Sequence, residues 1–275
     1  MNLPLWKAIL LAIVQGLTEF LPVSSKSHLM VAEKLLGVHV DSFIALAVLL
    51  HFGTLISLLI YYRRDWIEML RGLFRTDEAG LQARRLLGML VLGTIPVALV
   101  GVLAKDRLEN LYQNLTVTGA LWLVTAALLW YADRLSGKKG LEETRPVDAV
   151  WVGLAQAAAI LPGISRSGST IFGGLARGLA DEWAPRFAFL LSGPAVLGAT
   201  ALKAKDLVHA LHHGGMNAGP TPWATYVVAC VVSAVVGYGA IALTIRAVRA
   251  SQLKYFALWC VFMGLVAIVW GLRGG

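Results

Sequence analysis

The chain has 275 residues, of which 57% are hydrophobic and 15% are charged, and its formal net charge is +8. A mean hydropathy of +0.70 excludes an ordinary soluble domain, in which roughly 25% of residues are charged. The basic residues lie in short segments between apolar runs, which is typical of membrane proteins and argues against nucleic acid as a partner. Cys230 and Cys260 both lie within apolar runs, so we expect no disulfide framework.

The first half of the chain begins with an apolar stretch, 8–23, that is too short to cross a bilayer and is interrupted by a glutamate and a proline. A Ser-rich turn and a second short helical stretch, 26–36, follow it. The next three apolar runs, 42–62, 86–104 and 116–133, approach the length of about 20 residues that a hydrocarbon core of about 30 Å requires. They are predicted to be transmembrane helices.

The second half repeats this order. A short apolar stretch, 148–161, ends at a Pro-Gly pair, and a second short stretch, 166–179, follows. Three long runs come next: 183–203, 223–245 and 254–272. A helix that stops inside a membrane is tolerated only where protein or a water-filled cavity surrounds it. Both short pairs are therefore predicted to be re-entrant helix-turn-helix hairpins.

The two Ser-rich turns resemble each other. Residues 21–27, LPVSSKS, align with 161–167, LPGISRS, at an offset of 140 residues. Three spans after each hairpin would invert the second half relative to the first, and such folds place their site at the midplane between the repeats. The prediction is an all-α integral membrane protein with six transmembrane helices and two hairpins in an inverted-topology repeat, divided into 1–134, a cytoplasmic linker 135–147, and 148–275.

The loop charges predict the orientation. Four segments, 63–85, 134–147, 177–186 and 246–254, hold fifteen Lys and Arg residues, whereas the opposite side holds seven. Those seven are Lys7, Lys34, Lys105, Arg107, Lys203, Lys205 and Arg273. The bias places the four segments in the cytoplasm. The tips of the two hairpins are then expected to meet near the middle of the membrane.

The first turn carries a carboxylate at membrane depth. Glu19 shares a helix face with Gln15, four residues earlier. A buried carboxylate is costly unless it is paired, so Glu19 is a candidate metal ligand or proton acceptor. The alternative is a purely structural ion pair with Lys26 or Arg166.

The start of the second short helix adds hydroxyls and an imidazole. Ser24, Ser25, Lys26, Ser27 and His28 stand where free amide groups and the helix dipole favour a phosphate. One serine would need only a capping role, but this cluster exceeds it. His28 is three residues after Ser25, from where it could activate a hydroxyl or protonate a leaving oxygen.

The second turn is expected to bind the same phosphate. Its glycine, Gly163, allows close approach of the backbone. Arg166 offers a planar fork that matches phosphate oxygens. The hydroxyl donors are Ser165, Ser167, Ser169 and Thr170. His51, inside an apolar span, is either a cavity residue or a satisfied interior histidine.

At these residues the chain resembles a known family. The segments QGLTEFLPVSSKSH (15–28) and LPGISRSGST (161–170) are similar to the two signature motifs of the undecaprenyl-diphosphatase, or bacitracin-resistance, family. The resemblance implies removal of one phosphate from a polyprenyl diphosphate lipid that carries cell-wall polymers. It implies a multi-pass protein of the bacterial inner membrane, with a site open to the periplasmic face, and it leaves room for a homodimer.

The resemblance also implies residue roles and a divalent metal, Mg²⁺ or Ca²⁺. Glu19 matches the essential carboxylate of the family, and Gln15 its partner in metal binding. Ser25 and His28 match the catalytic serine and histidine, and Arg166 the arginine that clamps phosphate. The supporting hydroxyls match Ser165 and Thr170.

The chain departs from the family pattern at Lys26 and Ser27, where a hydroxyl residue and a glycine are usual. Gln15 in place of glutamate removes one metal-binding charge. Ser25, His28 and water all stay open as the nucleophile. A transporter of a phosphate-bearing lipid is the rival function, because inverted repeats with broken helices are also a transporter architecture. A purely structural scaffold would leave the paired polar turns unexplained.

Overall fold

The computed structural model describes residues 3–38, 40–103, 114–212 and 221–273, and within these ranges the chain is helical, without strands. The helices are α1 (Leu5–Phe20), α2 (Ser25–Leu36), α3 (Val40–Tyr61), α4 (Arg63–Gly72), α5 (Glu78–Leu103), α7 (Leu115–Ala132), α8 (Pro146–Ala158), α9 (Arg166–Ala176), α10 (Trp183–His212), α11 (Trp223–Arg249) and α12 (Leu253–Leu272). The predicted all-α class is confirmed. Lys105 and Arg107, counted above on the less basic side, lie outside the described residues.

Among the described residues, five helices are long and apolar enough to cross a membrane: α5, α7, the segment Trp183–Leu202 of α10, α11 and α12. The sixth predicted run forms α3, whose segment Ala45–Tyr61 meets the criterion as a pair with α4. A bend of 70° separates these two helices. It lies where the apolar run gives way to Arg63, Arg64 and Asp65. The chain is therefore a multi-pass membrane protein, and its described residues contain five candidate spans, or six if the bent pair counts as one.

Both predicted short helix pairs are present. Proline ends the first arm of each, because it cannot donate the next helical hydrogen bond and restricts the residue before it. Thus α1 stops at Phe20, before Pro22, and α8 stops at Ala158, before Pro162. At 16 and 13 residues these arms are shorter than a bilayer requires.

The second turn depends on Gly163. Its backbone has φ +88°, and an added Cβ would stand 2.3 Å from the carbonyl oxygen of Thr118 on α7. Gly163→Ala should therefore destabilise the protein by about 2–4 kcal/mol, from backbone strain and overpacking together. Thermal melting of the purified protein measures this loss. Gly239→Ala is the matched control, since no atom lies within 4 Å of its added Cβ. Equal melting temperatures for the two variants would contradict the prediction.

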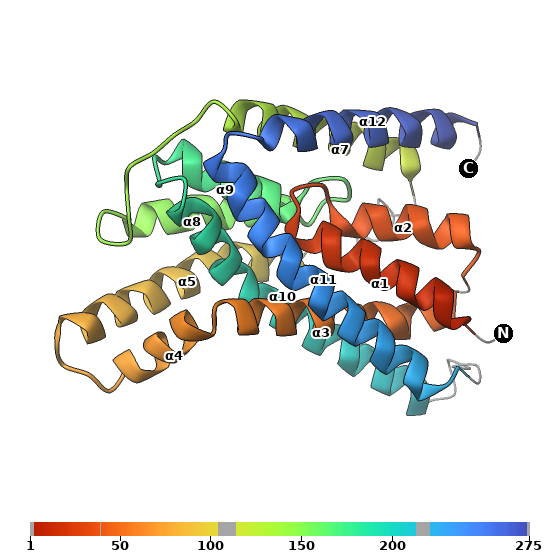
Figure 1. Cartoon of the computed structure of the whole chain (residues 1–275), viewed down its shortest axis with the longest axis horizontal. Coiled ribbons are helices and arrows are strands. Elements are labelled where there is room, and N and C mark those ends of the chain that lie inside the picture. The colour runs from red at the N-terminus through yellow and green to blue at the C-terminus, as the bar shows by residue number, and fades with distance from the viewer. Residues whose placement is uncertain (1–2, 39, 104–113, 213–220, 274–275) are drawn as a thin grey trace.

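The first arm of each pair packs closely on a long helix of the other half of the chain (Figure 1). Helix α1 lies against α11, and a Cβ on Gly16 would stand 2.8 Å from the carbonyl oxygen of Ser233. Helix α8 lies against α5, and a Cβ on Gly153 would stand 2.3 Å from the carbonyl oxygen of Gly93. Small residues allow such close backbone contact between membrane helices.

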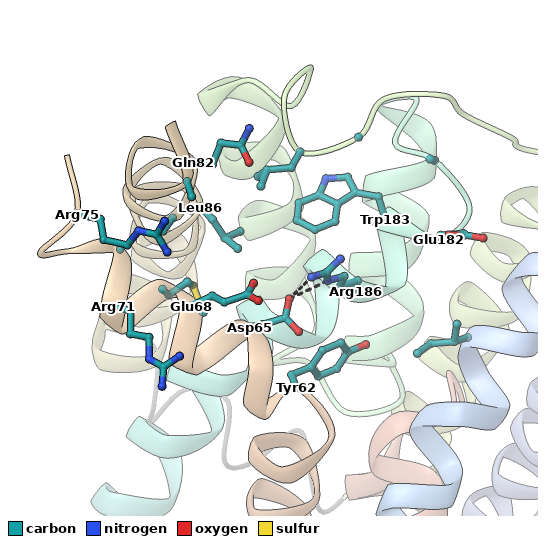
Figure 2. Close-up of a pocket in the computed structure, with 18 of the residues that line it drawn as sticks. Tyr62, Asp65, Glu68, Arg71, Arg75, Gln82, Leu86, Glu182, Trp183 and Arg186 are labelled. Carbon is teal, nitrogen blue, oxygen red and sulfur yellow. Dashed lines mark hydrogen bonds and ion pairs between the residues drawn. The ribbon is translucent and has the colours of Figure 1, made fainter. Parts of the chain in front are cut away.

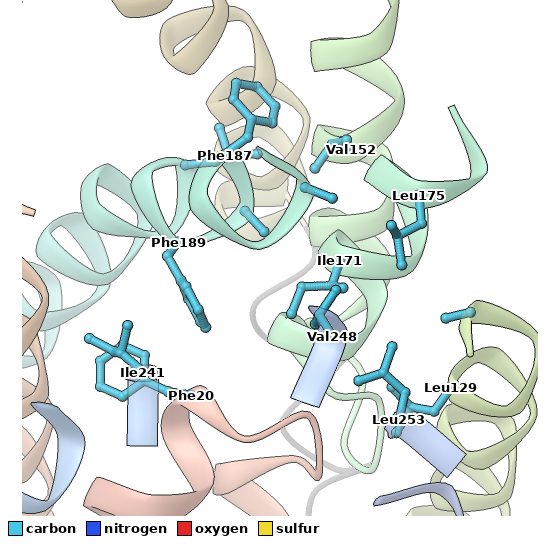
Figure 3. Close-up of a cluster of buried hydrophobic side chains, with 14 of the residues drawn as sticks. Phe20, Leu129, Val152, Ile171, Leu175, Phe187, Phe189, Ile241, Val248 and Leu253 are labelled. Atoms are coloured by element: carbon cyan, nitrogen blue, oxygen red, sulfur yellow. The ribbon is translucent and has the colours of Figure 1, made fainter. Parts of the chain in front are cut away.

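Both short helix pairs pack against the same hydrophobic core. Phe20 packs edge-on against Phe189 of α10, with ring centroids 5.7 Å apart. Figure 3 shows both rings beside Ile241 of α11. Ile171 and Leu175 of α9 belong to the same buried cluster. The two turns are consequently fixed relative to each other by one bundle interior.

The four basic segments meet on one face of the molecule. Trp183 Nε1 donates to Thr144 Oγ1 at 2.9 Å, and Arg85 donates to the carbonyl oxygen of Thr144, also at 2.9 Å. Arg249 forms an ion pair with Glu182. These contacts join 63–85, 134–147, 177–186 and 246–254, as expected for segments on the same side of a membrane.

Candidate active site where the two turns meet

The tips of the two helix pairs are in direct contact. Arg166, the first residue of α9, forms an ion pair with Glu19 of α1, with 2.5 Å between guanidinium and carboxylate. The carboxylate side chain is 5% exposed and the arginine side chain 21%. The pair thus joins residues 147 positions apart in an enclosed polar centre, and the predicted meeting of the two turns is confirmed.

Glu19 also accepts hydrogen bonds from its own half of the chain. Ser25 Oγ donates to Glu19 Oε2 at 2.6 Å, and Gln15 Nε2 donates to the same oxygen at 2.9 Å. The Ser25 bond has the geometry of a hydroxyl nucleophile with an adjacent base. The centre therefore contains a carboxylate, a hydroxyl and a guanidinium in mutual contact.

Other serines hold the turns together. Gly163 N donates to Ser27 Oγ at 2.8 Å, and Ser167 Oγ donates to the carbonyl oxygen of Leu21 at 3.0 Å. The hydroxyls of Ser24 and Ser27 are 3.1 Å apart. Of the hydroxyls predicted to bind phosphate, Ser24, Ser27 and Ser167 thus lie between the turns, where they fix the geometry of the centre.

Two further hydroxyls of the second turn, those of Ser165 and Thr170, satisfy backbone groups. Ser165 Oγ caps α9 by accepting from Gly168 N at 3.1 Å, and Thr170 Oγ1 donates to the carbonyl oxygen of Arg166 at 2.8 Å. Ser169 Oγ is buried and has no hydrogen-bond partner among the described residues. Both bonded hydroxyls support the first turn of α9, whose amide groups favour an anion.

Thr125 of α7 is a supporting residue that the sequence did not reveal. Its hydroxyl donates to the carbonyl oxygen of Gly163 at 2.8 Å and accepts from Ser165 N at 3.0 Å. A lone threonine in an apolar span carries no sequence signal for such a role. It is found only when α7 is placed beside the second turn.

His28 is held at both ring nitrogens. Its Nδ1 lies 2.8 Å from the carbonyl oxygen of Ser24, which can only accept, so Nδ1 carries the proton. Nε2 accepts from Trp259 Nε1 at 2.9 Å. The ring lies between Trp122 and Trp259 of α7 and α12. The arrangement fixes a neutral imidazole, and Trp259 sets its tautomer.

Comparison with known proteins places the chain in a family. Residues 8–266 match the family model described as bacitracin resistance protein BacA. The chain belongs to this family. It is similar to proteins named undecaprenyl-diphosphatase from Alkaliphilus metalliredigens, at 38% identity over 97% of this chain and 98% of the relative. Similar proteins of that name come from Carboxydothermus hydrogenoformans, at 37% over 96% of each, and from Syntrophotalea carbinolica, at 40% over 94% and 95%.

Lys26 and His51 lie near the polar centre formed by the two turns. Lys26 is exposed, and its charge acts on both Glu19 and Arg166. His51 lies on α3, where its charge acts on Glu19, and its Nδ1 is 2.8 Å from the carbonyl oxygen of Ala47. The centre therefore contains one carboxylate and three further groups that carry or can carry positive charge. This balance suits the binding of a diphosphate.

The donor atoms near Glu19 fit a divalent cation that shares its coordination with substrate. In the part of the chain that the structure describes, no group of three or more His, Cys, Asp or Glu side chains could hold a metal ion. Gln15 Oε1, however, is buried beside Glu19 without a hydrogen-bond partner. One carboxylate with phosphate oxygens and water is a common Mg²⁺ environment. Glu19 and Gln15 could thus hold such an ion.

The indole donor of Trp259 should matter for turnover. Trp259→Phe keeps an aromatic ring against His28 but removes the N–H that Nε2 accepts from. We expect hydrolysis of the lipid diphosphate to fall about threefold to tenfold, the scale of one hydrogen bond. Steady-state phosphate release from the purified protein measures this effect. Trp223→Phe, at a side chain 79% exposed, is the control. Equal activity of both variants would remove Trp259 from the site.

Proposed function

We propose that this chain is a membrane-embedded undecaprenyl-diphosphate phosphatase, which releases inorganic phosphate and leaves undecaprenyl phosphate for cell-wall synthesis. The observation that carries the proposal is the contact of Glu19 with both Ser25 and Arg166 at the meeting point of the two turns. Family membership and the names of the relatives support the same substrate.

The chemistry begins with the terminal phosphate beside Arg166 and the amides at the start of α9. Ser25 Oγ attacks the terminal phosphorus while Glu19 takes the hydroxyl proton. The bond from that phosphorus to the bridging oxygen breaks, and the bridging oxygen leaves with the lipid monophosphate. Water then hydrolyses the phosphoserine, releasing phosphate and restoring Ser25. Arg166 stabilises the charge on the equatorial oxygens in both steps.

Among the candidate nucleophiles, the contacts favour Ser25. Its hydroxyl already lies against a base, whereas both nitrogens of His28 are engaged by Ser24 and Trp259. His28 then acts by positioning the first turn of α2. Direct attack by water would still use Glu19 as the base, so the two routes differ in their dependence on Ser25.

A divalent ion, Mg²⁺ or Ca²⁺, is proposed to bind at Glu19 and Gln15. When bound, it would neutralise diphosphate charge and polarise the phosphoryl group. Isothermal titration of the purified protein with Mg²⁺ tests this assignment. Glu19→Gln should lose most of the affinity and Gln15→Leu part of it. Unchanged affinity in both variants would place the ion elsewhere.

The inverted repeat is the proposed architecture, with 1–134 and 148–275 as its halves and 135–147 as the linker. The crossed packing of α1 on α11 and of α8 on α5 supports it, since one contact is the repeat-related copy of the other. Gly93 and Ser233, which receive the two glycine contacts, differ by the same 140 positions as the paired turns. Both hairpins are proposed to be re-entrant.

The proposed location is the bacterial inner membrane, with the four basic segments in the cytoplasm and the site open to the periplasmic face. The positive charge of those segments supports this orientation. A homodimer stays a proposal, because lipid could cover the exposed apolar helix faces as well as a second copy could.

Phosphate release in detergent solution tests the function, because a carrier needs a gradient across a membrane and a hydrolase does not. The purified protein should release phosphate from undecaprenyl diphosphate. Ser25→Ala should lower the rate about 100-fold, with the residual rate due to direct attack by water. Ser192→Ala, at a buried hydroxyl bound only to the carbonyl oxygen of Phe189, is the control. Lipid binding without phosphate release would favour the transporter.

A further inference from the structure

A cavity lined by charged side chains lies on the face where the four basic segments meet, away from the paired turns. It has a volume of about 890 Å³ and is bounded by α4, α5, α10 and α11 (Figure 2). Tyr62, at the end of α3, forms part of its wall. The rings of Tyr62 and Phe189 are tilted against each other with centroids 6.4 Å apart, Phe189 packs edge-on against Phe20 at 5.7 Å, and Phe20 is next to Glu19 in the chain. An aromatic layer thus separates this cavity from the active site.

The cavity presents charges of both signs. Arg186 pairs with Asp65, with Nε donating to Oδ1 at 2.8 Å, and Figure 2 shows Glu68 beside this pair. Glu68 and Arg71 line the same cavity, and neither forms an ion pair within the described part of the chain. These two residues are three apart on α4, so their Cβ atoms are about 5–6 Å apart. The cavity therefore offers one acidic and one basic side chain from neighbouring positions on one helix.

Helix α4 joins this charged cavity to lipid. It leaves α3 at 70°, as a helix along a membrane surface would. Beside Arg71, the helix exposes Ile67, Leu70 and, just beyond its end, Phe74, the last with 90% of its surface accessible. Their i, i+3, i+7 spacing makes one apolar stripe, which is typical of a helix at the acyl–headgroup boundary. The cavity then lies at headgroup level.

We propose that this cavity binds the headgroup of an aminophospholipid, a phosphate followed by a primary amine, from the leaflet on the loop side. Arg71 receives the phosphate and Glu68 the ammonium, while the acyl chains follow Ile67, Leu70 and Phe74. The order of groups along such a lipid, acyl chain, phosphate and then amine, matches the order from the apolar stripe into the cavity. Basic pockets at this level of a membrane protein are known lipid sites, and Glu68 makes this one selective for an amine.

Titration of the purified full chain with dioctanoyl lipids, followed by native mass spectrometry, tests the proposal. Dioctanoyl phosphatidylethanolamine should bind about tenfold tighter than dioctanoyl phosphatidylglycerol, which lacks the amine, since one charge-assisted hydrogen bond separates them. Free phosphoethanolamine, without acyl chains, should bind more weakly than either lipid. Tight binding of the free headgroup would instead identify a soluble ligand and overturn the lipid assignment.

Three variants separate the roles. Glu68→Gln should bring the two lipids to equal affinity, and Arg71→Gln should weaken both about tenfold. Arg64→Gln makes the same charge change on α4 at a residue outside the cavity lining and should change neither affinity. The proposal fails if phosphatidylglycerol binds the wild-type chain as tightly as phosphatidylethanolamine. It also fails if Arg64→Gln weakens binding as much as Arg71→Gln.

Discussion

Arg166→Ala is expected to reduce phosphate release from undecaprenyl diphosphate by about 10³-fold or more. The residue joins the two turns through Glu19 and supplies the planar guanidinium for the transferred phosphoryl group. Arginines that stabilise the charge of a phosphoryl transition state contribute about 10³ to 10⁵ in rate. Arg166→Lys should recover only part of the lost activity, because an ammonium group keeps the positive charge but cannot donate two parallel hydrogen bonds as the planar guanidinium does.

Stability must be measured beside activity, since Arg166→Ala also leaves a carboxylate that is 5% exposed without its cation. Arg177→Ala is the matched control. It breaks the ion pair of Arg177 with buried Asp148, in which Nε donates to Oδ1 at 2.7 Å, but it lies outside both turns. Both variants should melt at lower temperature, and only Arg166→Ala should lose turnover in the folded fraction. Near-normal release by the Arg166 variant would contradict the whole assignment.

The sequence was sufficient to predict the meeting of the two turns. Pro22 and Pro162 stop helices at matching positions, and Glu19 and Arg166 are charges that an apolar environment forces together. The rotation of each long helix about its own axis, by contrast, cannot be predicted from the pattern of apolar and polar residues. The runs that form α3, α7 and α12 are apolar almost all round, so no polar face shows which side turns inward.

That ambiguity explains what sequence reasoning missed. Trp259 meets His28 across 231 positions, and Thr125 meets Gly163 across 38. Both contacts depend on how α12 and α7 rotate about their axes. The bend after Tyr61 has another cause: the predicted span 42–62 ends there as α3, and the charges of 63–85 predict a loop where the structure has the amphipathic α4.

Glu19→Gln is expected to lower phosphate release by about 10³-fold, within the range for loss of a general base. The amide has the size of the carboxylate but only one oxygen. That oxygen can accept from Ser25 or from Arg166, and the new NH₂ group faces donors that the carboxylate had satisfied. Glu19→Asp keeps the negative charge on a side chain that is one methylene shorter, so this variant should retain more activity than Glu19→Gln. Equal rates for the two variants would show that charge at this position is not needed.

The double variant Glu19→Gln/Arg166→Ala decides whether the two residues act as one unit. If Arg166 works mainly on phosphate that Glu19 and Ser25 have already positioned, the second substitution should add little to the first, as in other coupled catalytic groups. Independent roles would instead multiply the two losses. The ion pair between them makes coupling the expected result. It also makes the double variant more stable than Arg166→Ala alone, because no unpaired carboxylate is left buried.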